Sequence, residues 1–511
     1  MENKQKPARL LIEVIGRYDW LFEKLVDFGE SEIGTSHFII VSSKELKRKY
    51  QALIKQEGSV VITTEEVAEM HRLVRFNDAY DITATARQNE QEYNYRYLQD
   101  IMQQDRSVWS EKVPFSPNMV PRDKMLPDLE VFDRINRSFS VVKTIFDDFQ
   151  PDMLLLRPGW TFSTVALGVA AKKGIPCSMP RPARYRSLVT WTLGPYSHHA
   201  QLEMLFNSKE INLDIEENFS LQAPEGSRQV FSNFQKAYQT KALFRRFLIE
   251  TYNHSHKFVK TLLNKRFKDR PRYFTFLNRF ILEIQTIKYL RKIWVENADV
   301  IPGKKLLFLL PKEPEYTVQS LARGFCNVHA IITQIAVALP AGQTLLVKEH
   351  SRLGYRKLEF YKELNKFQNV VFVNPLLPSS HYLPACDATA TVAGTIALES
   401  CQLGLRCLTF SPRIEYKFLP NIRFTNDLYD VATALDFVLD DIEPKERLVY
   451  LAAAARYYAL LKETSFDAPG TKVFEGNGSI SADALKKSWF LLCENYKFQM
   501  KDQDANVEVN Y

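Results

Sequence analysis

The sequence predicts an α/β protein built from two Rossmann-like domains with a basic helical segment between them. Short apolar runs typical of buried strands alternate with helix-like segments on both sides of one Lys- and Arg-rich stretch. The length of 511 residues exceeds what one compact core usually holds and indicates two or three domains. A composition of 45% apolar and 25% charged residues is that of a folded chain, which excludes a wholly disordered, collagen-like or coiled-coil protein.

The N-terminal part of the chain alternates between predicted strands and helices. Residues 9–16 (RLLIEVIG) and 37–42 (HFIIVS) have the continuous apolar character of buried strands. Apolar side chains recur at helical spacing over 129–149. One βαβ unit of a parallel sheet then follows, with its strand, helix and second strand at 152–156, 163–173 and 177–179.

The middle segment, 230–297, is helical by pattern and carries the basic excess of the chain. Its residues 236–292 hold fifteen lysines and arginines against three acidic residues, a net charge of +12, whereas the whole chain has +7. Such a segment can bind a membrane surface rich in anionic lipid. The alternative is a helical insertion that packs on the protein with a basic outer face. No recognised nucleic-acid motif accompanies the charge, so we predict no nucleic-acid partner.

The C-terminal part repeats the alternation with greater regularity, which predicts a doubly wound parallel sheet. The predicted strands lie at 305–310, 344–348, 370–373, 387–392 and 406–410, and the helices at 318–339, 358–366, 395–403, 431–439 and 446–461. The predicted domains are therefore 1–229, a helical segment 230–300, and 301–500, with a polar, disordered tail at 501–511. Two parallel-sheet halves joined in this way outline a GT-B architecture, in which the two domains face a ligand cleft.

The sharpest local pattern in the C-terminal part surrounds Gly394. A strand ends there, the glycine allows a tight turn, and Thr395 stands at the start of a helix. Exposed backbone N–H groups and the threonine hydroxyl can hold a phosphate at such a place. Glu399 lies one turn later on the same side, where it can bind ribose hydroxyls. The alternative is an ordinary helix cap by Thr395 with a solvated Glu399.

Polar residues also follow two other predicted strands of this part. Lys348 and His350 stand at the end of the strand 344–348, and ligands of open parallel sheets bind at that edge. Together they offer a charge-assisted grip on a nucleotide phosphate, although a lone histidine is more often structural. Glu313 and Glu315 follow the strand 305–310, where carboxylates can serve in acid–base chemistry or bind hydroxyls. The alternative for this pair is a polar loop bounded by prolines.

Arginines and a tryptophan follow two predicted strands of the N-terminal part. Arg157 and Trp160 come after the strand 152–156, and Arg181, Arg184 and Arg186 come after the strand 177–179. Cations at adjacent strand ends indicate an anionic or sugar ligand, and Trp160 can stack on a sugar face. We therefore assign acceptor binding to Arg157, Trp160 and Arg184. A solvated structural cluster of arginines explains the pattern equally well.

The remaining composition points to the cytoplasm. The six cysteines form no CxxC pair and no His lies at zinc-finger spacing, so reduced, mostly buried thiols and no metal site are expected. No apolar stretch approaches the roughly 18 residues of a membrane span. The polar N-terminus is not followed by an apolar segment, so we expect no signal peptide.

Three segments, taken in order, resemble the C-terminal half of the capsule polysaccharide biosynthesis family, which includes bacterial Kdo transferases and related surface-glycan enzymes. The resemblance covers about a fifth of the chain, roughly 306–418, and is more specific as an ordered set than in any one piece. The matching residues are Pro314, Glu315 and Thr317, then Lys348, Glu349, His350, Gly354, Arg356, Phe360, Tyr361, Asn369 and Val370, and last Thr391, Val392, Ala393, Gly394, Thr395, Ala397, Leu398, Glu399 and Gly404.

The resemblance implies a GT-B glycosyltransferase that moves a sugar from a CMP- or UDP-activated donor to a surface polysaccharide or glycolipid. It implies that His350, Gly394 and Thr395 hold the nucleotide phosphate, with Lys348 nearby and Glu399 on the ribose. The family usually has proline after this histidine, whereas the chain has Ser351.

Such an enzyme needs no bound metal or cofactor, because helix ends and cationic side chains offset the phosphate charge. Glu315 is our first choice for a catalytic carboxylate and Glu313 the second. The basic segment adds peripheral binding to the inner membrane face as an expectation. The rival functions are a nucleotide-sugar epimerase or a polyol-phosphate transferase on the same fold, and a non-catalytic capsule assembly or export factor.

Overall fold

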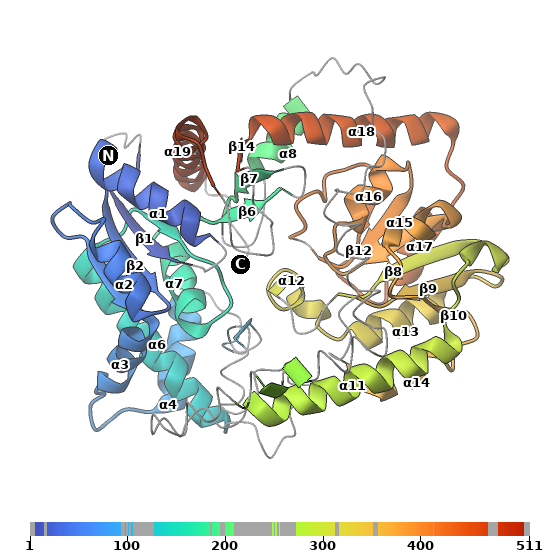
Figure 1. The fold of residues 1–511 in the computed structure, drawn as a ribbon, viewed down its shortest axis with the longest axis horizontal. Helices are drawn as coiled ribbons and strands as arrows, with labels where there is room; N and C mark the ends of the chain where they lie inside the picture. Colours follow the sequence, from blue (N-terminus) through green and yellow to red (C-terminus); the bar gives the residue numbers. More distant parts are fainter. Residues whose placement is uncertain are drawn as a thin grey trace. The chain divides into compact units, whose positions relative to one another are not determined.

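The chain folds into two compact units, each described here by itself. The computed structural model describes residues 6–14, 18–93, 98, 101, 104–105, 127–183, 187–194, 200–208, 248–249, 251–252, 255, 272–311, 316–350, 356–411, 413–468 and 479–504. Figure 1 traces the elements along the chain. The first unit comprises Met1–Val108, Leu126–Glu210 and Tyr457–Tyr511, and the second comprises Trp109–Met125 and Ile211–Arg456.

A five-stranded parallel sheet forms the centre of the first unit. Its strands follow the order β3-β2-β1-β4-β5. The sheet therefore begins at β1, grows to one side through β2 and β3, and reverses to the other side at β4, as in the Rossmann fold. The strands are β1 (Arg9–Glu13), β2 (Ser36–Val41), β3 (Val60–Thr63), β4 (Met153–Leu155) and β5 (Cys177–Ser178).

Helices cover both faces of this sheet. Leu10 and Ile12 of β1 share one core cluster with residues of α1, α2 and α19. Phe38 of β2 packs against Phe149 of α6, with ring centroids 5.6 Å apart. The capping box at Thr63 starts α3 directly after β3. The helices of the unit are α1 (Asp19–Phe28), α2 (Lys44–Gln51), α3 (Thr64–Leu73), α4 (Ile82–Glu92), α6 (Asp128–Phe149), α7 (Thr161–Lys172), α8 (Ala200–Ser208) and α19 (Ala482–Asp504).

The C-terminal end of the chain belongs to the first unit, not to the second. A small antiparallel sheet joins β6 (Pro180–Pro182), β7 (Leu188–Trp191) and β14 (Ser465–Asp467). The Trp191 indole N–H donates to the Ser488 carbonyl of α19 at 3.0 Å. The structure thus departs from the predicted domain 301–500, because residues from Tyr457 onward bury their apolar side chains in the first unit.

The second unit is built around a six-stranded sheet in which every neighbouring pair is parallel. The order is β10-β9-β8-β11-β12-β13, so in chain order within the unit the strands run 3-2-1-4-5-6, the Rossmann arrangement. The strands are β8 (Lys305–Leu309), β9 (Thr344–Lys348), β10 (Val370–Val373), β11 (Ala388–Thr391), β12 (Arg406–Thr409) and β13 (Ile422–Phe424).

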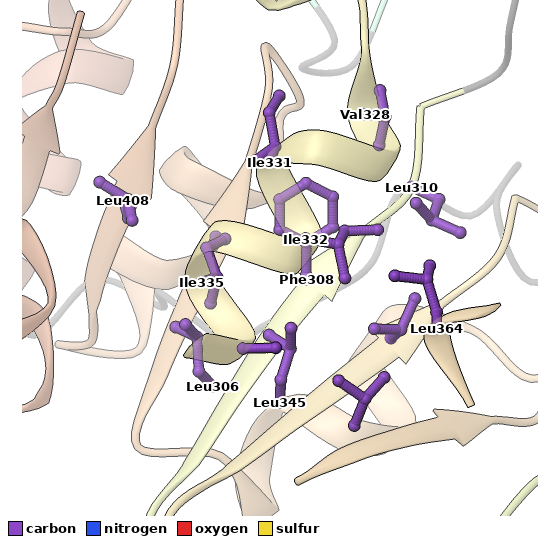
Figure 2. Close-up of a cluster of buried hydrophobic side chains, with 14 of the residues drawn as sticks. Leu306, Phe308, Leu310, Val328, Ile331, Ile332, Ile335, Leu345, Leu364 and Leu408 are labelled. Atoms are coloured by element: carbon purple, nitrogen blue, oxygen red, sulfur yellow. The ribbon is translucent and has the colours of Figure 1, made fainter. Parts of the chain in front are cut away.

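The core of the second unit explains why its strands read as apolar runs: both faces of the sheet are covered. On one face, Ile331, Ile332 and Ile335 of α13 pack over Leu306 and Phe308 of β8 (Figure 2). The opposite face packs against α15 and α16. The helices are α11 (Arg272–Ile293), α12 (Tyr316–Gln319), α13 (Val328–Ala338), α14 (Leu358–Leu364), α15 (Ser379–Tyr382), α16 (Ile396–Gln402), α17 (Val431–Leu439) and α18 (Pro444–Glu463), the last of which continues into the first unit.

Two predicted elements differ from the structure. The predicted helix 318–339 is divided into α12, a 3-10 turn at Arg323–Phe325 and α13, because Asn327 caps a new helix by accepting from Ala330 N at 3.3 Å. The tail predicted to be disordered from 501 is helical as far as Asp504, and residues 505–511 lie outside the described residues.

Most of the basic segment 236–292 lies outside the described residues, apart from α11 and a few positions before it. Helix α11 buries Ile287 and Leu290 in the core and exposes Lys288, Arg291 and Lys292. In this helix the segment is packed on the protein with a basic outer face.

The predicted fold class is confirmed: the chain is α/β with two Rossmann-like units, the domain composition of the GT-B type. The ligand cleft between the domains stays a prediction.

Candidate functional site

The strand order of the second unit defines where a ligand would bind. In an open parallel sheet, ligands bind beyond the carboxyl ends of the strands, at the point where the strand order reverses. Here that point lies between β8 and β11, which are hydrogen-bonded neighbours. We call the carboxyl ends of β8, β9 and β11, with the residues that follow them, the ligand edge of the second unit. Lys348, His350, Gly394 and Thr395 all stand at this edge.

Gly394 closes a turn that has no room for a side chain. Its N–H donates to the Thr391 hydroxyl at 3.0 Å, and its carbonyl accepts from the Tyr416 hydroxyl at 2.7 Å. A Cβ atom on Gly394 would lie 2.5 Å from the Thr391 oxygen. The glycine predicted from sequence is therefore required for packing, and Tyr416, which sequence reasoning missed, holds the turn from the opposite side.

Thr395 does not cap the helix that it begins. It makes no side-chain capping hydrogen bond to α16, and its hydroxyl donates to Glu399 Oε1 at 3.3 Å. The second oxygen of Glu399 accepts from the Ser379 hydroxyl, also at 3.3 Å. The alternative of a capping threonine beside a solvated glutamate is therefore wrong. Glu399 instead joins the segment after β10 to the segment after β11.

Lys348 is a buried cation at the last position of β9. Its side chain is 5% exposed, and its Nζ donates to the Pro375 carbonyl at 3.3 Å. Burial lowers the pKa of Lys348 to about 8, although the negative charges of Glu349 and Glu399 partly oppose the shift. A bound anion near this ammonium would raise its pKa again and so stabilise its charged form.

Next to Lys348, a buried ion pair holds the backbone of His350. Glu349 Oε1 accepts from Arg356 Nη1 at 2.7 Å and from His350 N at 2.7 Å. Glu349 Oε2 accepts from the Tyr361 hydroxyl at 2.6 Å, and Arg356 Nη2 donates to the Pro311 carbonyl. His350 itself is half-buried. The backbone N–H of the histidine predicted from sequence is thus held by a buried, hydrogen-bonded ion pair that the sequence did not reveal.

Three of the predicted site residues lie outside the described residues. They are Glu313 and Glu315 after β8, and Arg184 after β6. Their assignment to catalysis and to acceptor binding stays a prediction. The predicted absence of a metal site also stays a prediction, and within the described ranges no cluster of three or more His, Cys, Asp or Glu side chains could hold a metal ion.

The first unit has its own strand-order reversal, between β1 and β4, and a half-buried carboxyl group lies there. Glu13 is the last residue of β1, and its Oε2 accepts from the Ser163 hydroxyl of α7 at 2.8 Å. Burial raises the pKa of Glu13, and Ser163, Arg157 and Trp160 partly offset the rise. The sequence analysis did not predict this residue. A glutamate inside the otherwise apolar run 9–16 could have indicated it.

Arg157 and Trp160 each lower the pKa of Glu13 against the larger effect of burial. Both were predicted from sequence. The start of α7 beside them is occupied by the chain itself, because Asp105 accepts from Thr161 N and from the Thr161 hydroxyl, each at 2.6 Å. The edge of the first unit therefore joins an indole, a guanidinium and a half-buried carboxyl group, a combination that can contact a sugar.

The cysteines fit the sequence prediction of mostly buried thiols. Five of the six cysteines are buried and one is partly buried. Burial raises the pKa of Cys177, Cys386, Cys401 and Cys407 to about 12, so these thiols are unreactive. Within the part of the chain that the structure describes, no helix is both long and apolar enough to span a membrane.

Comparison with known proteins gives remote structural likenesses only. No protein-family model and no curated protein matches the sequence. The chain is similar to the UDP-GlcNAc 2-epimerase of Methanocaldococcus jannaschii in complex with UDP-GlcNAc and UDP, with 12% identity, 89% of this chain and 99% of that chain covered, and a TM-score of 0.25.

It is also similar to the UDP-GlcNAc 2-epimerase of Neisseria meningitidis bound to UDP-GlcNAc, at 11% identity over 88% of this chain and 95% of that chain, with a TM-score of 0.23. A third likeness is to CalG4, the calicheamicin glycosyltransferase, at 10% identity over 89% and 94%, with a TM-score of 0.27. The fold assignment rests on the strand order of the two sheets.

Proposed function

We propose that the protein is a glycosyltransferase that transfers a sugar from a nucleotide-activated donor, a CMP- or UDP-sugar, to a glycan or glycolipid acceptor of surface polysaccharide synthesis. The observation that carries the proposal is the ligand edge of the second unit. There, a Rossmann strand order brings Lys348, His350, Gly394 and Thr395 to the place where such sheets bind nucleotides. These four are among the residues that carry the resemblance to the capsule polysaccharide family.

In this proposal the second unit binds the donor. His350 and Thr395 donate hydrogen bonds to the diphosphate or monophosphate of the nucleotide, and Lys348 supplies positive charge from beneath the edge. When the nucleotide binds, the Thr395 hydroxyl turns its single O–H from Glu399 Oε1, 3.3 Å away, to the phosphate, and Glu399 contacts the ribose. A buried ammonium and fixed N–H donors stabilise the negative charge that develops on the leaving nucleotide.

The first unit supplies the acceptor site in this proposal. Trp160 offers an aromatic face for a sugar ring, Arg157 offers donors to its hydroxyls, and Glu13 can accept or give a proton at an acceptor hydroxyl. Glu315 and Glu313 remain the carboxylates proposed for catalysis on the second unit. The +12 charge of 236–292 favours a lipid-linked acceptor at the inner membrane face, because anionic lipid attracts basic segments.

Nucleotide binding is the first test. We expect the protein to bind CMP or UDP nucleotides in calorimetry and to gain thermal stability from them. His350→Ala and Thr395→Val should each weaken binding by about 1–3 kcal/mol, the scale of a hydrogen bond to a charged group. Thr286→Val is the matched control, because this hydroxyl is buried on α11 without a hydrogen-bond partner among the described residues.

If His350→Ala, Thr395→Val and the control Thr286→Val all bind the nucleotide as tightly as the parent does, the donor site does not lie at this edge.

Product analysis separates the proposed reaction from its rivals. Nucleotide release that requires an acceptor, with the sugar found on that acceptor, is expected of a transferase. Interconversion of the nucleotide sugar without acceptor would identify an epimerase, and transfer of a polyol phosphate would identify the other enzymatic rival. Nucleotide binding without any turnover would favour a non-catalytic assembly or export factor.

A further inference from the structure

The second sheet carries two arginine-centred clusters of the same composition, one at the carboxyl ends and one at the amino ends of its strands; Glu349 of the first is buried, whereas the Glu446 side chain of the second is 32% exposed. Each consists of an arginine, a glutamate, a tyrosine and a backbone carbonyl. The first, at the ligand edge, contains Glu349, Arg356, Tyr361 and the Pro311 carbonyl. The second contains Arg406, Glu446, Tyr450 and the Phe437 carbonyl. Arg356 and Arg406 are each 5% exposed, so the two guanidinium groups are equally buried.

The ligand-edge cluster joins two neighbouring strands beyond their ends. Arg356 reaches Glu349, which directly follows β9, and also the Pro311 carbonyl, which follows β8. Strands β8 and β9 are paired from Lys305↔Thr344 to Leu309↔Lys348. Beyond the last pair, the Arg356 side chain connects the two chain segments that follow these strands. Its guanidinium also lies over the Phe360 ring, 5.2 Å from the centroid. The two segments that leave the sheet here are thereby fixed relative to each other.

The same cluster fixes one predicted ligand residue directly. Glu349 Oε1 receives both Arg356 Nη1 and the backbone N–H of His350, each at 2.7 Å. The tyrosine hydroxyl occupies the other oxygen at 2.6 Å. Because the carboxylate is held from two further directions, the His350 backbone has one defined position at the ligand edge.

The opposite cluster has the same kinds of group but more hydrogen bonds, and it contains no predicted ligand residue. Arg406 is the first residue of β12, so it lies at the amino ends of the parallel strands. Its Nη2 lies 2.7 Å from both oxygens of Glu446, and its Nε lies 3.2 Å from Glu446 Oε1 and 3.1 Å from the Tyr450 hydroxyl. Its bonds attach α18 to the sheet. The molecule thus contains an internal control for a purely structural arginine.

We propose that Arg356 is a positioning residue that, through Glu349 and the Pro311 carbonyl, sets where His350 stands at the nucleotide edge of the second unit. This inference rests on the proposed nucleotide-sugar function and deepens it. Arginine is required because one planar group must serve two acceptors in different directions, which the single ammonium of lysine cannot do with the same geometry. Arg356 need not touch the nucleotide.

The test compares Arg356→Lys with Arg406→Lys in the full-length protein. A milder comparison is Tyr361→Phe with Tyr450→Phe, because each of these changes deletes only one hydroxyl group. Both lysine variants should lower the melting temperature, since each loses buried hydrogen bonds. Only Arg356→Lys should speed hydrogen exchange at the His350 amide, by about 10-fold, the scale of one lost hydrogen bond. Only Arg356→Lys should weaken CMP or UDP binding, also by about 10-fold, and Tyr361→Phe should do so less strongly.

Equal losses of nucleotide affinity in Arg356→Lys and Arg406→Lys would overturn the inference, because stability alone would then explain both. Unchanged exchange at His350 in Arg356→Lys and in Tyr361→Phe would overturn it as well. If the parent binds neither nucleotide, the proposed function fails, and the exchange comparison still decides whether Arg356 fixes His350. Should Arg356→Lys not fold, Tyr361→Phe against Tyr450→Phe gives the same decision.

Discussion

The two units share a strand order but differ in the charge of one residue near the point where that order reverses. In the first unit the last residue of β1 is Glu13, and in the second the last residue of β9 is Lys348. Burial acts on both in the same physical sense, because it penalises the charged form. It raises the pKa of the Glu13 carboxyl and lowers the pKa of the Lys348 ammonium to about 8.

The two units therefore differ in one residue at a strand end, although their strand order is the same. The strand order sets where a ligand can bind, and the charge of that residue sets which kind of ligand group is favoured there. The ammonium of Lys348 favours an anion near it, as a nucleotide phosphate would be. The carboxyl group of Glu13, with its elevated pKa, favours a neutral partner that can exchange hydrogen bonds or a proton, as a sugar hydroxyl would. The predictions below test this contrast.

The largest effect is expected for Lys348→Met in alkaline solution. The folded-state pKa of Lys348 is about 8 and the ordinary value 10.5, so the unfolded chain holds more protons between these pH values. The parent should therefore gain about 3 kcal/mol of unfolding free energy relative to the variant as pH rises from about 8 to about 10.5. Chemical unfolding at several pH values measures this difference.

Lys362→Met, at an exposed lysine of α14, is the control and should show no such pH-dependent difference. A flat parent-minus-variant curve for Lys348→Met would mean that the amine is hydrated, and the charge contrast between the two edges would disappear.

Gly394→Ala tests how tightly the ligand edge of the second unit is packed. The added Cβ would meet the Thr391 oxygen at 2.5 Å, so we expect a loss of about 1–3 kcal/mol in unfolding free energy, the usual cost of overpacking. Gly324→Ala is the matched control, since its Cβ would have no described atom within 4 Å. It should remain within about 0.5 kcal/mol of the parent. Equal stability of the two variants would show that the turn at Gly394 adapts easily.

The smallest effect is expected for Glu13→Gln in the first unit. A raised folded-state pKa gives stability that is complete below pH 4.5 and is lost as pH rises through the folded value. The parent should therefore lose stability relative to the variant between pH 4.5 and neutrality, as seen by thermal unfolding across that range. Glu32→Gln, at an exposed glutamate of the turn Gly29–Ile33, should not. Parallel curves for parent and Glu13→Gln would mean that Glu13 ionises normally.

Much of the fold could be predicted because both sheets are buried on two faces. Continuous apolar runs such as that of β8 follow directly from this burial, and α17 was predicted with its exact bounds, Val431–Leu439. β3 was missed because only four residues, Val60–Thr63, separate two polar stretches. The return of α19 to the first unit was missed because it depends on distant packing, which no local pattern records.

The candidate site divides in the same way. Gly394 and His350 could be predicted because a tight turn and the end of a strand are recognisable from neighbouring residues in the sequence. Glu349 and Arg356 were only parts of a motif, since their 2.7 Å ion pair connects residues whose burial becomes visible in the folded chain. For Glu399 the sequence allowed a solvated side chain, whereas the hydroxyl groups of Thr395 and Ser379 hold it.

The discontinuous first unit has a consequence for how the protein is made. Its core cluster unites Leu10 and Ile12 with Phe466 and Trp489, so segments that precede and follow the second unit in the sequence complete one hydrophobic core. A ribosome delivers these partners in order from the N-terminus, and the second unit emerges in between. During synthesis, the first unit therefore exposes apolar surface until its later segments are made. Chaperones bind surface of this kind. The core of the first unit is complete only after α19 has been synthesised.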